Sequence, residues 1–315
     1  MKGSFKKYWE KFGTLTIFVV MYVLFAFVAP KSFRTPRNFV QIITQSATII
    51  LLACSEFFAI LLGGIDLSIG SVVAFCGMIT CKLMVSFQWP PALAFLVGSV
   101  GVGLLCGALN GTLINVTGVH PFIITLGTQS IFRALTLIIS NAQATFGMPQ
   151  SFTQMFGGLY HGVPMAVVIA LIVALICWFI TSQLTFGRNL YVMGGNREAA
   201  FFSGINVKKH LLMVHTLSGL FSGICGSVMA ARLGAAEPNA AVGAETGAIA
   251  AAIIGGTSFF GGKGEIPNVI IGALILGLIN NGLTMCSVPT FYQTLATGIL
   301  LIAAVSLDHA ISSKK

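Results

Sequence analysis

The sequence predicts an all-α fold: a polytopic transmembrane bundle of about ten helices, with both termini in the cytoplasm. Of its 315 residues, 56% are hydrophobic and only 8% are charged, whereas roughly a quarter of the residues in a soluble domain are charged. A soluble protein needs polar groups on its surface, but a bilayer accepts apolar side chains there. We therefore expect residues 1–315 to form one domain surrounded by membrane lipid.

Ten segments approach the roughly 20 apolar residues that a helix needs to cross the hydrocarbon core. They are predicted at residues 14–30, 41–62, 66–86, 91–114, 121–140, 163–182, 211–232, 246–260, 268–286 and 290–307. The glycine-rich stretches 63–70 and 255–264 indicate either tight turns or broken helices inside the bundle. One of the ten segments is therefore open to interpretation as re-entrant.

The basic residues set the predicted orientation. An even number of spans puts both termini on one side, and the positive-inside bias puts that side in the cytoplasm. The cytoplasmic side then holds Lys2, Lys6, Lys7, Lys11, Arg188, Arg197, Lys208, Lys209, Lys263, Lys314 and Lys315, against Lys31, Arg34 and Arg37 outside. The net charge of +9 thus reflects membrane anchoring, and no nucleic-acid partner is expected.

Glycines at four-residue spacing predict close helix packing, because small residues on one helix face let two backbones approach. They occur at Gly103, Gly107 and Gly111, and again at Gly219 and Gly223. Such spacing supports the bundle and says nothing of its cargo.

Two long loops stand out between the predicted spans. The outer one, residues 141–162, carries no formal charge and either docks a soluble partner or caps the bundle. The inner one, residues 183–210, contains a short helix with readable ends. Asn196 is expected to cap it, Glu198 lies in its first turn, and Gly204 takes the left-handed closing position.

The middle of this short helix is apolar, with Phe201 and Phe202 after two alanines. A cytoplasmic helix that exposes two aromatic rings marks an interface. Two interpretations remain: the loop folds against its own bundle, or it binds to a motor protein in the cytoplasm. The candidate coupling residues are Gly187, Arg188, Gly194, Gly195, Asn196, Arg197, Glu198, Ala199, Ala200, Phe201, Phe202, Ser203 and Gly204.

Several motifs together resemble the permeases of ribose-type ABC sugar importers. They are FGRNLYVMGGNREAAFFSGI from Phe186, GGIDLSIGS from Gly63, HPFIITLGT from His120 and IIGGTSFFGGKG from Ile253. Within that family, ACSEFFAILLGGIDLSIGS, RLGAAEP and GLINNGL resemble the allose permeases more than the ribose permeases. The resemblance covers nearly the whole chain in the expected order.

This resemblance implies a permease subunit of the bacterial inner membrane that carries D-allose or a ribose-like monosaccharide. It also implies partners: a second permease chain in a homo- or heterodimer, a cytoplasmic ATP-binding subunit, and an extracytoplasmic sugar-binding protein. The chain has no GxxxxGK[ST] phosphate loop, so ATP and magnesium are expected in the ATPase partner. No cofactor is expected in this chain.

Polar residues inside the predicted spans are the candidates for the translocation pathway. They are Glu56, Asp66, Ser68, Asn110, Thr125, Gln129, Asn280 and Asn281. A charge in mid-membrane needs a partner or water, so Glu56 either hydrogen-bonds sugar hydroxyls or pairs with Arg133. Asp66 is expected to cap the next helix, a role compatible with facing the pathway. The uncharged residues fit sugar contacts and helix-to-helix bonds equally well.

Other function classes make different use of these residues. In an ion-coupled secondary transporter, Glu56 and Asp66 would hold protons or sodium at broken helices. A permease for branched-chain amino acids would use intramembrane charges for its zwitterionic cargo. Enzyme motifs such as HExxH and GxSxG are missing, and the seven cysteines lack metal-type spacing, so neither a catalytic nor a metal site is expected.

Overall fold

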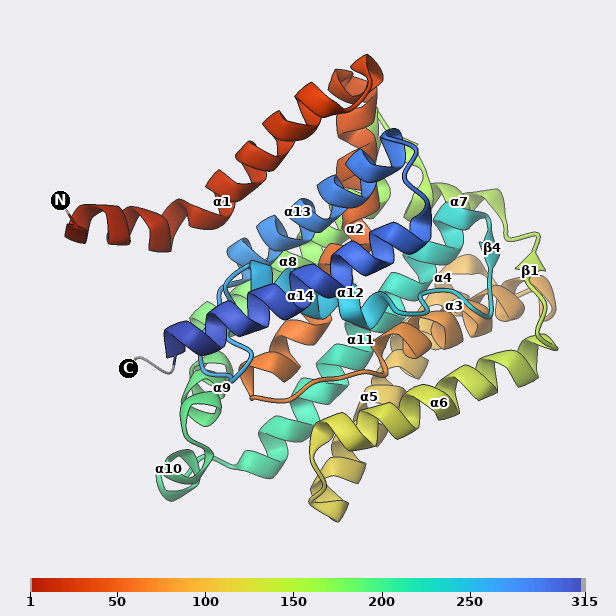
Figure 1. The fold of residues 1–315 in the computed structure, drawn as a ribbon. Helices are drawn as coiled ribbons and strands as arrows, with labels where there is room; N and C mark the ends of the chain where they lie inside the picture. Colours follow the sequence, from red (N-terminus) through yellow and green to blue (C-terminus); the bar gives the residue numbers. More distant parts are fainter. Residues whose placement is uncertain (1, 313–315) are drawn as a thin grey trace.

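The computed structural model describes the backbone of residues 2–312, which form a bundle of long helices (Figure 1). Six helical segments are long and apolar enough to cross a membrane: α2 (Pro36–Leu61), the continuous helix Pro91–Thr117, α6 (Pro121–Ser140), α8 (Met165–Gln183), α11 (Val207–Leu233) and α13 (Ile266–Met285). Four shorter apolar segments lie in α1 (Lys2–Val28), α3 (Ile69–Val85), α12 (Ala244–Ile254) and α14 (Thr290–Ser312). The helical membrane bundle is confirmed, whereas the ten crossings and the side of the termini stay predictions.

Short elements connect and interrupt these helices. The helix Pro91–Thr117 consists of α4 (Pro91–Ala94), a π-helical stretch η2 (Phe95–Gly101) and α5 (Val102–Thr117). The remaining helical elements are η1 (Lys31–Arg34), α7 (Gln150–Gly157), α9 (Thr185–Gly195) and α10 (Arg197–Phe202). Residues 141–162 and 183–210 are thus partly helical.

Four two-residue strands complete the described residues. β1 (Thr145–Phe146) pairs antiparallel with β4 (Ala235–Ala236), and β2 (Leu159–Tyr160) pairs with β3 (Val163–Pro164). The first pair joins residues 141–162 to the segment that follows α11. The strand pair β1–β4 therefore holds residues 141–162 next to α3, on the side of the bundle away from α10 (Figure 1).

The long helix α11 runs through the centre of the bundle and packs very closely on α5. A Cβ atom built on Gly107 would lie 2.1 Å from the carbonyl oxygen of His215, and one on Gly219 would lie 2.2 Å from that of Gly103. Any larger side chain at these positions would push the two backbones apart. The predicted close packing through glycine is confirmed, and it brings polar side chains of α11 within reach of its neighbours.

The segment between α11 and α13 is only half helical. At a rise of 1.5 Å per residue, the 11 residues of α12 cover about 16 Å, roughly half of the hydrocarbon thickness. The predicted span 246–260 is therefore too long, because the helix ends at Ile254 and residues 255–264 turn back through five glycines. Broken backbone at membrane depth needs protein partners for its peptide groups.

Candidate functional site

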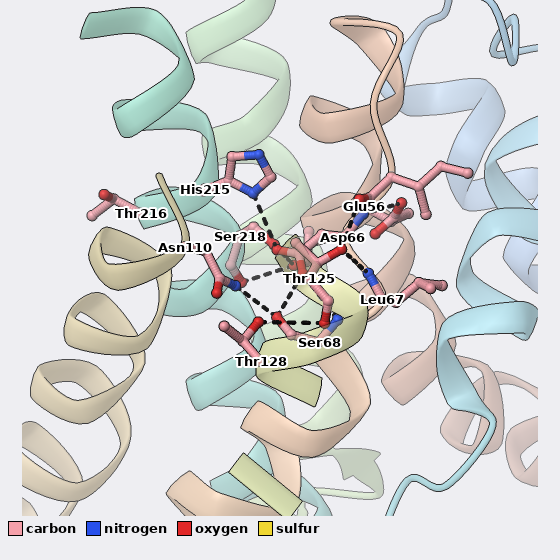
Figure 2. A network of polar contacts seen from close by, with 12 residues as sticks. Glu56, Asp66, Leu67, Ser68, Asn110, Thr125, Thr128, His215, Thr216 and Ser218 are labelled. Atoms are coloured by element: carbon pink, nitrogen blue, oxygen red, sulfur yellow. Dashed lines mark hydrogen bonds and ion pairs between the residues drawn. The ribbon is translucent and has the colours of Figure 1, made fainter. Parts of the chain in front are cut away.

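A buried polar network lies where α2, α3, α5, α6 and α11 meet, and Asp66 is at its centre (Figure 2). Its Oδ1 accepts hydrogen bonds from the backbone N–H of Ser68 at 3.0 Å and from the Ser68 hydroxyl at 2.6 Å. Its Oδ2 accepts one from the Ser218 hydroxyl at 2.8 Å and lies 3.4 Å from Nδ1 of His215. Both carboxylate oxygens are thus engaged by protein groups. The predicted cap of the next helix is not found, because Asp66 bonds to the N–H of the N-cap residue Ser68 and α3 has no side-chain cap hydrogen bond.

Glu56 of α2 reaches the same network, and its predicted pair with Arg133 is wrong. Glu56 is fully buried and its Oε1 accepts a hydrogen bond from the backbone N–H of Asp66 at 3.0 Å. Arg133 instead donates to the carbonyl oxygens of Pro238 at 2.6 Å and Ala240 at 2.9 Å. These carbonyl oxygens belong to the non-helical segment before α12, where no helical N–H groups are available to them. The guanidinium of Arg133 supplies the hydrogen-bond donors instead.

Side chains of α5 and α6 satisfy the broken backbone between α2 and α3. Asn110 Nδ2 donates to the Ser68 hydroxyl at 2.8 Å. Thr125 Oγ1 accepts a hydrogen bond from the N–H of Leu67 at 3.1 Å. The same hydroxyl donates to the carbonyl oxygen of Ile65, also at 3.1 Å. Three predicted pathway residues, Ser68, Asn110 and Thr125, therefore support the turn between two helices.

Sequence reasoning missed the contribution of α11. His215, Ser218 and Ser222 lie at positions i, i+3 and i+7, and so form one polar stripe on the helix. Ser55 of α2 donates to the carbonyl oxygen of Ser218 at 2.8 Å, and its hydroxyl lies 3.0 Å from that of Ser222. A polar stripe at helical spacing in an apolar span was the signal that could have found them.

A second carboxyl cluster joins α6 to α12. Gln129 Nε2 donates to Oε1 of Glu245 at 3.0 Å. A Cβ atom on Gly70 would lie 2.5 Å from the carbonyl oxygen of Ala241 and 2.7 Å from Oε2 of Glu245. Glycine at position 70 is therefore required for α3 to approach the start of α12. Glu245 was outside the predicted span by one residue and was not a candidate.

The neighbours Asn280 and Asn281 of α13 have different surroundings. Asn281 Oδ1 accepts a hydrogen bond from Asn38 Nδ2 of α2 at 3.0 Å and is buried. Asn280 lines a cavity of about 440 Å³ between α2, α12, α13 and α14. We call this space the outer cavity, and the group around Asp66 the buried network.

The predicted short helix in residues 183–210 is α10, and its ends are as expected. Asn196 Oδ1 accepts a hydrogen bond from the N–H of Ala199 at 2.9 Å, and Gly204 has φ of +82°. Ala200 is buried, but the side chains of Phe201 and Phe202 are 64% and 84% exposed. A hollow of about 850 Å³ lies beside the two rings. α10 projects from the end of the bundle (Figure 1).

The preceding helix α9 attaches this projection to the bundle. A Cβ atom on Gly194 would lie 1.9 Å from the carbonyl oxygen of Leu61, which also accepts a hydrogen bond from the N–H of Gly262 at 2.9 Å. The Tyr191 hydroxyl donates to the carbonyl oxygen of Gly264 at 2.8 Å, and burial raises the pKa of Tyr191. Three glycine-rich motifs, far apart in sequence, therefore meet at the end of α2.

The other candidate coupling residues are distributed over both helices. Gly187 packs against α8, since its Cβ would lie 2.3 Å from the carbonyl oxygen of Ile180, and Arg188 is exposed. Gly195, Arg197, Glu198 and Ser203 are exposed around α10. Among the described residues, no three histidine, cysteine, aspartate or glutamate side chains are grouped as metal ligands.

Comparison with known proteins gives similarity along the whole chain. The family described as "Branched-chain amino acid transport system / permease component" matches residues 38–305. The D-allose transport system permease protein of Escherichia coli K12 is 51% identical over 309 residues, 98% of this chain and 94% of the relative.

More distant relatives extend the same similarity. The ribose import permease protein of Bacillus subtilis is 36% identical over 306 residues, 96% of this chain and 94% of its own. The L-arabinose ABC transporter permease protein of Azospirillum brasilense is 31% identical over 297 residues, 94% and 87% of the two chains. No solved structure matches the chain.

Proposed function

The chain belongs to the family of branched-chain amino acid transport system permease components, and from this premise we propose that it is the permease subunit of an ABC importer for D-allose or a similar monosaccharide. The single observation that supports this most is the 51% identity to the D-allose permease protein along 98% of the chain. It is a multi-pass protein of the bacterial cytoplasmic membrane.

α10 is the proposed contact for a cytoplasmic ATP-binding subunit. Its two exposed rings and the adjoining hollow give a partner an apolar surface to cover, and such surfaces mark interfaces. ATP and Mg²⁺ would be bound by that partner. ATP-driven movement of α10 would pass through α9 to the end of α2, because Gly194 and Gly262 both contact Leu61 there.

The orientation follows from this role. With α10 in the cytoplasm, ten crossings put both termini there as well, and α12 with the segment before it counts as one discontinuous crossing. Residues 141–162, with α7 and the pair β1–β4, then face outward, where an extracytoplasmic sugar-binding protein would dock. A second permease chain, identical or different, would complete the membrane part.

The contacts of Asp66 argue against this carboxyl group as an ion site. Both oxygens of Asp66 accept hydrogen bonds from protein donors, whereas Oε2 of Glu56 and Oε2 of Glu245 are buried without a partner among the described residues. The carboxylate of Asp66 therefore supports the fold more readily than it exchanges ions. The relatives described above are permeases for allose, ribose and arabinose, which also disfavours an amino acid as cargo.

Uptake tests the proposal directly. Cells that express the chain with an allose-binding protein and ATPase should accumulate radiolabelled D-allose, and cells without the chain should not. The uptake should stop when ATP is depleted and persist when a protonophore collapses the ion gradient. The opposite dependence would make the chain a secondary transporter.

Ala199→Glu tests the proposed coupling surface. Ala199 is exposed on α10, so the charge should leave the fold intact but weaken the contact with the ATPase and abolish most uptake. Co-purification of the ATPase with the tagged chain is the readout. Gln154→Glu on the exposed face of α7 adds the same charge on the opposite side of the membrane and should leave the ATPase bound. Wild-type uptake by Ala199→Glu with the ATPase bound would reject the assignment.

A further inference from the structure

The outer cavity borders α2 near the middle of that helix, away from the coupling surface near its end. It is bordered by Thr48 in the first half of α2, whereas α9 contacts Leu61 at the end of that helix. The 13 residues between these positions correspond to about 20 Å along the helix. In the orientation proposed above, the cavity therefore lies in the outer half of the membrane, where a sugar would be delivered.

The lining of the cavity is mostly apolar, with several uncharged polar groups and no charged residue. Hydroxyl and amide groups come from Thr48, Thr246, Asn280, Gln293, Thr294 and Thr297, among apolar side chains and backbone. The volume of about 440 Å³ falls in the range of about 300–1,000 Å³ typical of small-molecule sites. A guanidinium, that of Arg232, lies outside the lining and donates to Thr48 at 3.5 Å. A neutral polyol needs only the exchangeable hydrogen bonds that the lining offers.

Several of these polar groups have hydrogen-bonding capacity to spare. Among the described residues, the side chains of Asn280 and Thr246 have no hydrogen-bond partner. Thr294 and Thr297 donate to carbonyl oxygens of their own helix, from Thr290 at 3.2 Å and Gln293 at 3.0 Å. A hydroxyl that donates in this way still accepts through its lone pairs, and sugar hydroxyls both donate and accept.

We propose that the outer cavity is a transient binding site for the neutral monosaccharide during its passage through the membrane, with Asn280 and Thr246 as its main hydrogen-bonding residues. This inference rests on the proposed transport function. It assigns substrate contact to a different part of the molecule from the buried network. The weak, uncharged lining lets the sugar leave again once the inner side opens.

Two glycines of the lining allow the cavity to be filled without damage to the fold. A Cβ atom on Gly247 of α12 or on Gly298 of α14 would meet no atom within 4 Å, and the same is true of Gly127 on α6, which is outside the cavity. Leucine is also a better helix former than glycine. Gly247→Leu and Gly298→Leu should therefore block the cavity, and Gly127→Leu is the matched control.

The experiment uses the complete complex in proteoliposomes, with D-allose outside and ATP in the lumen that the ATPase faces. The readout is the number of sugar molecules imported per ATP hydrolysed. Gly247→Leu and Gly298→Leu should lower this ratio roughly tenfold or more, and Asn280→Leu about tenfold, which corresponds to the loss of one good hydrogen bond. Gly127→Leu should match the wild type.

The outcomes separate the two proposals. If the wild type imports no sugar, the proposed function fails. If the wild type imports sugar and both leucine variants import as much sugar per ATP, the cavity is not a binding site for the sugar and this inference fails. It also fails if the variants lose the complex on size-exclusion chromatography, because the cavity would then be packed against a second copy of the chain.

Discussion

The buried network and the outer cavity contain the same kinds of polar side chain and use them in opposite ways. In the network, Asp66 and Thr125 are no more than 1% exposed and bond to protein groups. In the cavity, Asn280 borders about 440 Å³ of space and has no side-chain partner among the described residues. Polar residues that bond one another hold helices together, and those left open in a hollow are available to cargo.

Position in the fold sharpens this contrast. The network occupies the break between α2 and α3, where the chain has non-helical backbone inside the bundle and each peptide group needs a partner. The cavity is bordered by turns of α2, α12, α13 and α14 together with the short segment 241–243 before α12. Side chains there are free for another purpose.

The largest effect is expected from Asp66→Ala, which removes the centre of the network. The hydroxyls of Ser68 and Ser218 would lose their acceptor inside the bundle. Removing a buried charged partner of this kind lowers the free energy of unfolding by roughly 3–5 kcal/mol. Thermal unfolding in detergent, followed by a thiol-reactive dye, is the measurement, because six of the seven cysteines are buried and react only on unfolding. Removing the exposed carboxylate by Glu198→Ala should leave the melting temperature unchanged.

Ser218→Ala should have an intermediate effect. The substitution removes one donor to Asp66 and one contact with Ser55, at about 1–2 kcal/mol in total. The same thermal assay should show a smaller shift than for Asp66→Ala. The sugar imported per ATP by the surviving protein should stay at the wild-type value. A fall in that ratio at normal stability would place the network in the pathway and break the comparison.

Glu56→Gln should have the smallest effect. Only Oε1 of Glu56 accepts a hydrogen bond, from the Asp66 N–H, and the amide oxygen of glutamine can accept the same bond. We expect a loss of about 1 kcal/mol or less, with uptake and membrane level falling together. Uptake that collapses while the membrane level is unchanged would make Glu56 a pathway residue.

The sequence predicted the bundle and the short helix α10 well because both depend on local signals. Apolar length identified the helical segments, and Asn196 with Gly204 marked the ends of a helix that the structure confirms. Glycine spacing likewise predicted the close contact between α5 and α11. Each of these features depends on consecutive residues or on a fixed spacing along the chain.

The surroundings of polar side chains could not be predicted in this way, since they depend on contacts between distant segments. Asn280 and Asn281 are adjacent in sequence, yet one lines a cavity and the other bonds to Asn38, 243 residues away. Arg133 was paired with the wrong group because no local signal shows that the carbonyl oxygens of Pro238 and Ala240, more than 100 residues away, lie beside it. Only the packing shows which polar group is enclosed.

Thiol accessibility tests the contrast between the two regions most directly. Thr294→Cys in the cavity and Ser218→Cys in the network would be compared in a Cys286→Ser background, where the remaining native cysteines are buried. A membrane-impermeant thiol reagent added from outside should label Thr294→Cys and leave Ser218→Cys unlabelled, and D-allose should slow the labelling. Equal labelling of both positions, or labelling of Ser218→Cys alone, would contradict the account.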